Sequence, residues 1–271
     1  MMLSTSNKVK LLGHLLRDLG LEYLLELETL DPQYKCLKEL SAKFSEGELA
    51  LISVLGSIVA YRLSKRGEEY WRELTDYFLN IKVAKDPSSI ASTFIEFLRS
   101  SKTNRVLLKQ KTRRVEKLVN RGFHKTLFHR FNEYSQDLFK LWSNLAVNLN
   151  ADRKTKTVVF AVKMFYYAIR ASHGNKVLRV PLEIPVPVDL RVFRISHKLG
   201  LVRGRRFTQK QAKLVQEIWQ RVASVSGIAP LHIDVLLWML GSLNEYKELL
   251  LRLAKKHKRV SIVMKIIFMA K

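Results

Sequence analysis

The segment EIPVPVD, residues 183–189, places a single carboxylate directly after two prolines. The residues that follow, LRVFRISHKLGL, carry apolar positions at helical spacing, which predicts a helix over 190–201 with Asp189 as its N-cap. An N-cap carboxylate accepts backbone N–H bonds, and these favour its ionised form. Such a group can take a proton from an amine and stabilise positive charge that develops during a reaction. Capping alone is the commoner role of an aspartate in this position, so both interpretations stand.

A lysine elsewhere in the chain offers a matching nucleophile. The stretch NLNADRKTKTVVFAVKMFYYAIRAS has a polar loop between two apolar stretches, which predicts a helix–loop–helix hairpin. Lys156 falls in the first turn of the second helix, where the helix N-terminus already carries partial positive charge. Together with Arg153 and Lys154, this disfavours the ammonium form, and a neutral amine is a nucleophile. The alternative is a lysine that reaches from the hairpin to a phosphate.

Positive charge is concentrated after residue 100. The chain has 48 Lys and Arg against 24 Asp and Glu, a net charge of +24. Residues 1–100 hold 13 basic and 14 acidic side chains, whereas the remaining 171 hold 35 and 10. This surplus indicates a polyanionic partner, of which nucleic acid is the leading candidate, with a solvated basic surface as the alternative. The basic runs are KQKTRRVEK (109–117), RGRRFTQKQAK (203–213) and KKHKR (255–259).

Aromatic residues accompany both chemical groups. Phe160 lies four residues after Lys156 and so on the same helical face, Trp238 lies four after Asp234, and Trp71 follows a polar segment. Aromatic residues at helical spacing usually belong to a core. A base extruded from a nucleic acid duplex, however, requires aromatic plates on its faces and polar groups at its edge.

The elements that must position these residues are predicted to be helices. Apolar residues recur at three- and four-residue spacing along most of the chain, without sustained alternation, a Gly-rich phosphate loop or an internal repeat. The sequence therefore predicts an all-α fold. The breaks that contain proline and glycine are too short for interdomain linkers, which favours one compact domain with two lobes.

Several other classes of protein are disfavoured. The single cysteine, Cys36, excludes an internal disulfide framework, and the seven histidines lack metal-site spacing, so we expect no metal. The N-terminal residues MMLSTSNKVK do not lead into a signal peptide, and the longest apolar stretch (49–61) is too short to span a bilayer. We therefore expect an intracellular protein of the cytoplasm or nucleoid.

Five separated motifs resemble those of a known family, in order and with nearly its spacing, from about Leu16 to Gly241. The family is the archaeal 8-oxoguanine DNA glycosylases, often called AGOG, a branch of the helix-hairpin-helix glycosylases. The motifs are DPQY (31–34), AYRLSKRGEEYW (60–71), KTVVFAVK (156–163), IPVPVDLRV (184–192) and PLHIDVLLWMLG (230–241).

The resemblance implies a helix-hairpin-helix DNA glycosylase-like fold in one catalytic domain, 1–271, with the active site in the cleft between two lobes. Lobe A, about 1–84 plus 190–271, would hold the base pocket. Lobe B, about 85–189, would hold the hairpin and the catalytic lysine.

The resemblance also implies an enzyme that excises 8-oxoguanine from DNA and then nicks the strand. Lys156 matches the family's Schiff-base lysine and Asp189 its catalytic aspartate. Lys156 would attack the sugar C1′, expel the base and leave an imine that undergoes β-elimination. Asp189 would help to deprotonate Lys156 and stabilise the oxocarbenium-like charge. No cofactor is implied.

Further positions match the family's base pocket: Gln33, Trp71, Phe160, Asp234 and Trp238, with Pro187 lining it. The aromatic rings can stack on the base, and the Gln33 amide can both donate to and accept from its edge. Asp234 only accepts, which suits the additional N7–H of 8-oxoguanine. Ala60 stands where family members carry serine, so a main-chain contact to the base would survive there and a hydroxyl contact would not.

Two alternatives remain open: a non-catalytic helical DNA-binding protein, and a glycosylase for another damaged base. The expected partner is DNA that contains 8-oxoguanine, bound through phosphates by the basic C-terminal two-thirds of a monomer. The segment after Gly241 matches nothing in the family. Its basic and apolar character is compatible with packing, DNA contact or self-association.

Overall fold

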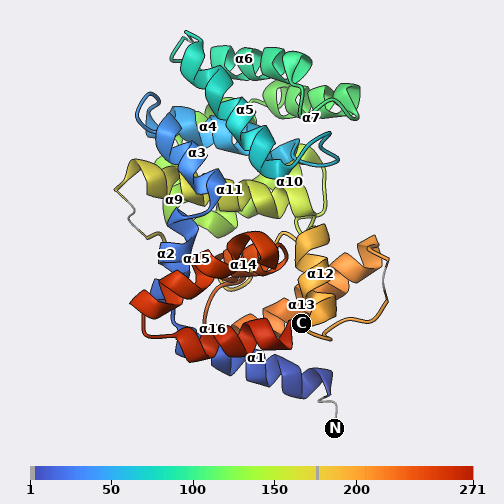
Figure 1. Cartoon of the computed structure of the whole chain (residues 1–271). Coiled ribbons are helices and arrows are strands. Elements are labelled where there is room, and N and C mark those ends of the chain that lie inside the picture. The colour runs from blue at the N-terminus through green and yellow to red at the C-terminus, as the bar shows by residue number, and fades with distance from the viewer. Residues whose placement is uncertain (1–3, 83, 175–176, 205, 271) are drawn as a thin grey trace. The chain divides into compact units, whose positions relative to one another are not determined.

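The computed structural model describes residues 4–82, 84–174, 177–204 and 206–270. Within these ranges the chain forms sixteen helices and no strand (Figure 1). The prediction of an all-α fold is therefore confirmed. The chain divides into two compact units, which we call the terminal unit (Met1–Leu30 with Val180–Lys271) and the central unit (Asp31–Arg179).

This division differs from the predicted lobes. Residues 31–84 belong with the helices that carry Lys156, not with the terminal helices, and residues 180–189 belong to the terminal unit. The reason is the packing of α4 (Glu46–Ile58) against α11 (Lys156–Ser172). Both helices are buried around nearly their whole circumference, so each has partners on every side.

The central unit is built around this pair of buried helices. The capping box of Ser45 and Glu48 starts α4, since the Glu48 carboxylate accepts the Ser45 N–H at 2.6 Å. The surrounding helices are α3 (Pro32–Leu40), α5 (Gly67–Asn80), α6 (Pro87–Ser100), α7 (Leu108–Asn120), α8 (Phe123–His129), α9 (Phe131–Gln136) and α10 (Leu138–Leu149).

The predicted hairpin is present as α10, a loop and α11. The loop is fixed by side chains at its base: the Trp142 indole N–H donates to the Arg153 carbonyl at 2.6 Å, and the Arg153 guanidinium lies 4.8 Å from the Trp142 ring centroid. Asp152 accepts the Lys154 N–H at 2.8 Å. Arg121 of α7 donates to carbonyls at the end of α10. These contacts hold the start of α11 in a defined place.

The terminal unit joins the two ends of the sequence. Its helices are α1 (Thr5–Leu19), α2 (Leu21–Thr29), α12 (Leu190–Lys198), α13 (Gln209–Ser226), α14 (Pro230–Leu240), α15 (Leu243–Lys256) and α16 (Val260–Met269). Helix α1 packs on α13 and α16, and α2 packs on α14 and α15. The segment after Gly241 thus packs against the body of its own unit, through side chains such as Leu250, Val263 and Ile267.

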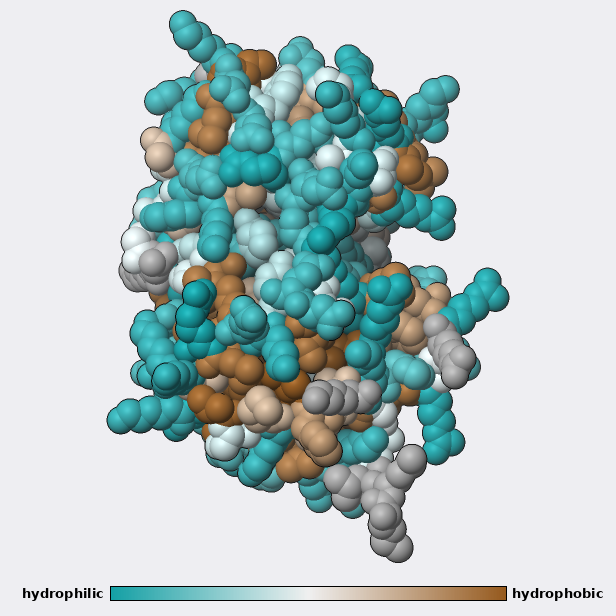
Figure 2. All heavy atoms as spheres, in the orientation of Figure 1, coloured by the Kyte–Doolittle hydropathy of each residue, from teal (hydrophilic) through white to brown (hydrophobic). Residues whose placement is uncertain are grey.

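Part of this unit's surface is apolar. Helix α16 exposes Val260, Met264 and Phe268, which share one helical face at four-residue spacing. Apolar atoms also gather in Figure 2 over the region where Figure 1 draws α14 to α16. In the described part of the chain, no single helix is long and apolar enough to cross a membrane, and α13 and α14 reach that length and composition only when joined across a 116° bend.

Candidate active site

Lys156 is the first residue of α11, as predicted, and its side chain is half-buried. Its ammonium donates a hydrogen bond to the Ala60 carbonyl at 3.0 Å and lies 4.4 Å from the centroid of the Phe160 ring. Phe160 is one turn further along the same helix, so the ring and the main-chain oxygen together confine the amine. The candidate nucleophile is therefore held by two noncovalent contacts, which leave its nitrogen able to form a covalent bond.

The oxygen that Lys156 contacts lies in a tight turn after α4, which we call the Ala60 turn (residues 59–62). The Ala60 N–H donates to Ser57 at 3.1 Å, and Arg62 has a positive φ of 44°. Because Ala60 reaches Lys156 through its main chain, a serine in this position would make the same contact. In this structure the Ala60 carbonyl therefore faces the candidate nucleophile.

Two further pocket candidates lie in the same unit. The Trp71 ring, 1% exposed, meets Phe160 edge-on, with centroids 6.3 Å apart. Gln33 is buried at the start of α3, and a methyl group added at Gly67 would lie 4.0 Å from its amide nitrogen. The structure thus brings Trp71, Phe160 and Lys156 into one set of contacts, with Gln33 facing the start of α5.

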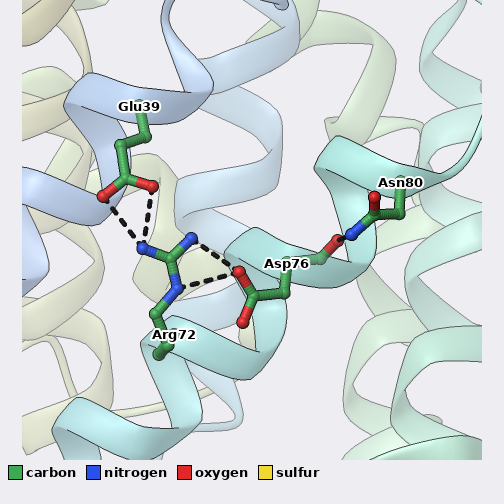
Figure 3. A network of polar contacts seen from close by, with 4 residues as sticks. All are labelled: Glu39, Arg72, Asp76 and Asn80. Atoms are coloured by element: carbon green, nitrogen blue, oxygen red, sulfur yellow. Dashed lines mark hydrogen bonds and ion pairs between the residues drawn. The ribbon is translucent and has the colours of Figure 1, made fainter.

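An ion-pair network ties together the helices that carry Gln33 and Trp71. The Arg72 guanidinium of α5 pairs with Glu39 of α3 at 2.7 Å and with Asp76, one turn along α5, also at 2.7 Å (Figure 3). Asn80 continues the network through the Asp76 carbonyl at 2.8 Å. Arg72 is half-exposed, so its contribution is mainly to orient α3 and α5 rather than to stabilise the fold.

Asp189 lies in the terminal unit and is the N-cap of α12, as predicted. Its Oδ1 accepts the N–H groups of Arg191 and Val192, each at 2.9 Å. The proline segment before it is held by α13, since the side-chain amides of Gln216 and Gln220 donate to the carbonyls of Val186 and Leu182. The carboxylate is therefore held by the first turn of the helix that follows it, and the segment that precedes it is held by α13.

Trp238 and Asp234 lie on α14 of the same unit, and Asp234 is only 3% exposed. The Arg191 guanidinium lies 4.2 Å from the Trp238 ring centroid, and Tyr246 packs against that ring at 5.5 Å. Arg191 therefore links the cap of Asp189 to Trp238. Pro187, the remaining predicted pocket residue, is buried in the segment before Asp189.

Sequence reasoning missed two basic residues of α7 that lie close to the start of α11. Arg114 donates to the Thr157 hydroxyl at 3.0 Å, and burial lowers its pKa. Lys111 contacts the Ala60 turn, and burial lowers its pKa to about 8. Arg114 thus contacts α11 itself, and Lys111 contacts the turn whose Ala60 carbonyl accepts from Lys156. One signal was present, because Lys111 falls on the apolar stripe of Leu108, Val115 and Leu118.

Groups suited to a metal do not gather in the part of the chain that the structure describes, where no cluster of three or more His, Cys, Asp or Glu could hold an ion. Cys36 is buried on α3, and burial raises the pKa of its thiol, which disfavours the thiolate that metals bind.

The chain is similar to known proteins over most of its length. The family model AGOG, N-glycosylase/DNA lyase, matches residues 13–266. Similar proteins named N-glycosylase/DNA lyase include one from Methanopyrus kandleri, 36% identical over 231 residues (84% of this chain and 88% of the relative). One from Thermococcus kodakarensis is 35% identical over 248 residues, 90% of this chain and 89% of the relative.

Among solved structures, an 8-oxoguanine DNA glycosylase from Pyrobaculum aerophilum, crystallised with 8-oxoguanosine, matches with a TM-score of 0.74 and 31% identity. The match covers 88% of this chain and 89% of that one. The fold, the amine at the start of α11 and these relatives define the class as an all-helical DNA glycosylase with lyase activity. Within that class, the chain belongs to the AGOG family of N-glycosylase/DNA lyases.

Proposed function

We propose that this enzyme excises 8-oxoguanine from DNA through an imine on Lys156 and then cleaves the strand by β-elimination. The observation that carries the proposal is the half-buried Lys156 amine at the N-terminus of α11, held by the Ala60 carbonyl and the Phe160 ring. The choice of lesion is supported by the relative from Pyrobaculum aerophilum, which is described as an 8-oxoguanine DNA glycosylase.

In the proposed reaction, a bond forms between the Lys156 nitrogen and the sugar C1′ while the C1′–N9 bond breaks. The base leaves with the bonding electrons and takes a proton, and the attacking amine loses one. The ring opens to an imine, whose electron demand acidifies C2′, so that loss of a C2′ proton expels the 3′ phosphate. Asp189 would balance the positive charge that develops on the sugar, and it would accept a proton as the amine reacts.

The proposed recognition of the base combines stacking and edge contacts. Trp71, Phe160 and Trp238 supply aromatic rings, and stacking of this kind contributes about 1–3 kcal/mol per base. Gln33 would donate to and accept from the edge of the base. Asp234 accepts only, so it suits the N7–H donor that distinguishes 8-oxoguanine from guanine. Pro187 would line the pocket, and Ala60 would contribute its main chain.

The proposed DNA contacts use the surplus of basic residues after residue 100. Exposed lysines and arginines of 109–117, 203–213 and 255–259 would bind phosphates, although Arg205 lies outside the described residues. We propose that a monomer binds the DNA. Because the substrate is DNA, the cytoplasm or nucleoid is the proposed location.

Borohydride trapping tests the proposal directly. The wild-type protein, Lys156→Gln and Lys154→Gln would each be incubated with a duplex that carries one 8-oxoguanine, in the presence of borohydride. We expect a covalent complex with the wild type and with Lys154→Gln, which removes an exposed charge two residues away, but none with Lys156→Gln.

The alternatives give different results in the same assay. A non-catalytic DNA-binding protein would shift the duplex in a gel but trap nothing, and would leave the lesion strand intact. A glycosylase for another base would trap a duplex with a different lesion and leave 8-oxoguanine in place. Trapping by Lys156→Gln at the wild-type rate would contradict the choice of nucleophile.

A further inference from the structure

Lys111 of α7 is a fully buried lysine, with 0% of its surface exposed. Its Nζ donates to the Asn104 side-chain oxygen and, at 3.4 Å, to the Arg62 carbonyl, and it lies 4.9 Å from the centroid of the Tyr61 ring. These three partners are all neutral groups. An ammonium buried against neutral partners is costly, since no full negative charge offsets its lost hydration. An uncharged side chain would fill the same space at lower cost, so the charge requires an explanation.

The contacts of Lys111 converge on the Ala60 turn. The Lys111 ammonium contacts the ring of Tyr61 and the carbonyl of Arg62. It holds Val59 through Asn104, whose amide donates to the Val59 carbonyl at 3.4 Å. Residues on both sides of Ala60 are therefore fixed by one ammonium group. The Ala60 carbonyl between them accepts the hydrogen bond from Lys156 at 3.0 Å.

The support for Asn104 is itself rigid. The Asn104 N–H donates to the Ser101 hydroxyl at 3.0 Å, and Glu73 of α5 accepts from the Lys102 and Thr103 N–H groups. The Thr103 carbonyl in turn accepts from Ser64 at 2.8 Å, just after the Ala60 turn. Lys111 thus connects the Ala60 turn to a loop that is anchored on α5, so the turn cannot move independently of the unit's core.

We propose that Lys111 is a positioning residue for the nucleophile: it fixes the Ala60 turn, and the Ala60 carbonyl then sets the direction of the Lys156 amine. The inference rests on the proposed function, because it requires Lys156 to be the attacking group. Lys111 does not act on the substrate itself. Its effect is on the geometry from which the amine reaches C1′.

Lys111→Met tests the proposal, because methionine keeps the length and packing of the side chain but loses its donors. A displacement of about 1 Å at a reacting group can cost roughly 100-fold in rate, so we expect trapping at saturating enzyme to slow by roughly 10- to 100-fold. The enzyme concentration at half-saturation should change little, since a buried group makes no phosphate contact. Lys85→Met is the control, because it removes the same charge from an exposed position of the central unit that lies outside the three basic runs.

Each protein would be assayed on two duplexes, one with 8-oxoguanine and one with an abasic site. The abasic sugar presents its aldehyde directly, so imine formation there depends on the amine and not on base recognition. We expect Lys111→Met to slow trapping on both duplexes and Lys85→Met to slow neither. Asn104→Ser should slow both as well, and the double variant should be no slower than the worse single variant, because both residues act on one turn. If Lys111→Met does not fold, judged by circular dichroism and Tm, Asn104→Ser carries the test.

The outcomes separate this inference from the proposed function. A wild-type protein that traps neither duplex would overturn the function and the inference together. A wild type that traps, with Lys111→Met trapping both duplexes at the same rate, would overturn the inference alone. Slower trapping only on 8-oxoguanine would also overturn it, since Lys111 would then act in recognition of the base.

Discussion

At the scale of single residues, the central unit buries two basic side chains, and burial of each charge lowers the stability of the fold. Burial lowers the pKa of both Lys111 and Arg114. Arg114 contacts Thr157 in the first turn of α11, and Lys111 contacts the Ala60 turn. A fold optimised for stability alone would not gather cations there. Groups with perturbed pKa values concentrate at functional sites, so this part of the central unit is where a functional site is expected.

The titration of Lys111 gives a prediction about stability. Burial lowers its pKa from 10.5 to about 8, so between these pH values the unfolded chain binds more protons at this position than the folded chain. The contribution of Lys111 to the free energy of unfolding should therefore rise with pH across this window. Relative to Lys111→Met, the wild type should become more stable from about pH 8 to 10.5 in urea denaturation. The curve for Lys85→Met should run parallel to that of the wild type, and a parallel curve for Lys111→Met would contradict the burial of its charge.

At the scale of elements, Asp189 depends on a close approach between two helices. A Cβ added at Gly241, after α14, would lie 2.8 Å from the Arg191 oxygen and 3.0 Å from its carbonyl carbon, in the first turn of α12. These are backbone atoms, so they cannot move aside as a flexible side chain can. Glycine is therefore needed here to let α12 begin where it does, with Asp189 as its cap.

Gly241→Ala should displace the start of α12 and with it the Asp189 carboxylate. Overpacking of this kind costs about 1–3 kcal/mol, so we expect a lower Tm together with slower excision at saturating enzyme. Ser242→Ala, at the next residue, is the control and should change neither. Normal excision by a destabilised Gly241→Ala protein would show that the position of α12 does not limit the reaction.

Much of the local structure could be predicted from the sequence, because its causes are local. The start of α11 and the cap of α12 follow from a polar loop and from Pro-x-Pro-x-Asp, and both predictions were confirmed. The boundaries of the two units differ from those of the predicted lobes, because they depend on the packing of α4 with α11, two helices far apart in the sequence. The role of Lys111 was missed for a similar reason, since a basic run reads as surface until its partners are known.

At the scale of the whole molecule, charge is the dominant property. The net charge of +24 predicts strong electrostatic attraction to nucleic acid, and the partners of individual basic residues differ. Arg206 is exposed before α13, whereas Arg72 is neutralised by two carboxylates. Only exposed cations such as Arg206 are available to phosphates.

Arg206→Gln should therefore weaken binding to damaged and undamaged duplexes alike. Loss of one phosphate contact makes the negative slope of log K against log salt concentration shallower by about 0.9. Arg72→Gln removes the same formal charge and should leave the slope nearly unchanged. The slopes would be measured by fluorescence anisotropy over a series of salt concentrations, and equal slopes for Arg206→Gln and the wild type would place the phosphate contacts on other basic residues.

The terminal unit also constrains how the protein is made. Helices α1 and α2 leave the ribosome before the central unit, but their packing partners are α13 to α16, which are synthesised after it. The apolar faces of α1 and α2 must therefore stay uncovered while the whole central unit is translated, although that unit has its own core and can fold in the meantime. During synthesis, the emerging chain thus consists of a folded central unit preceded by two helices whose apolar faces are exposed. Chaperones that bind exposed apolar segments would bind this form.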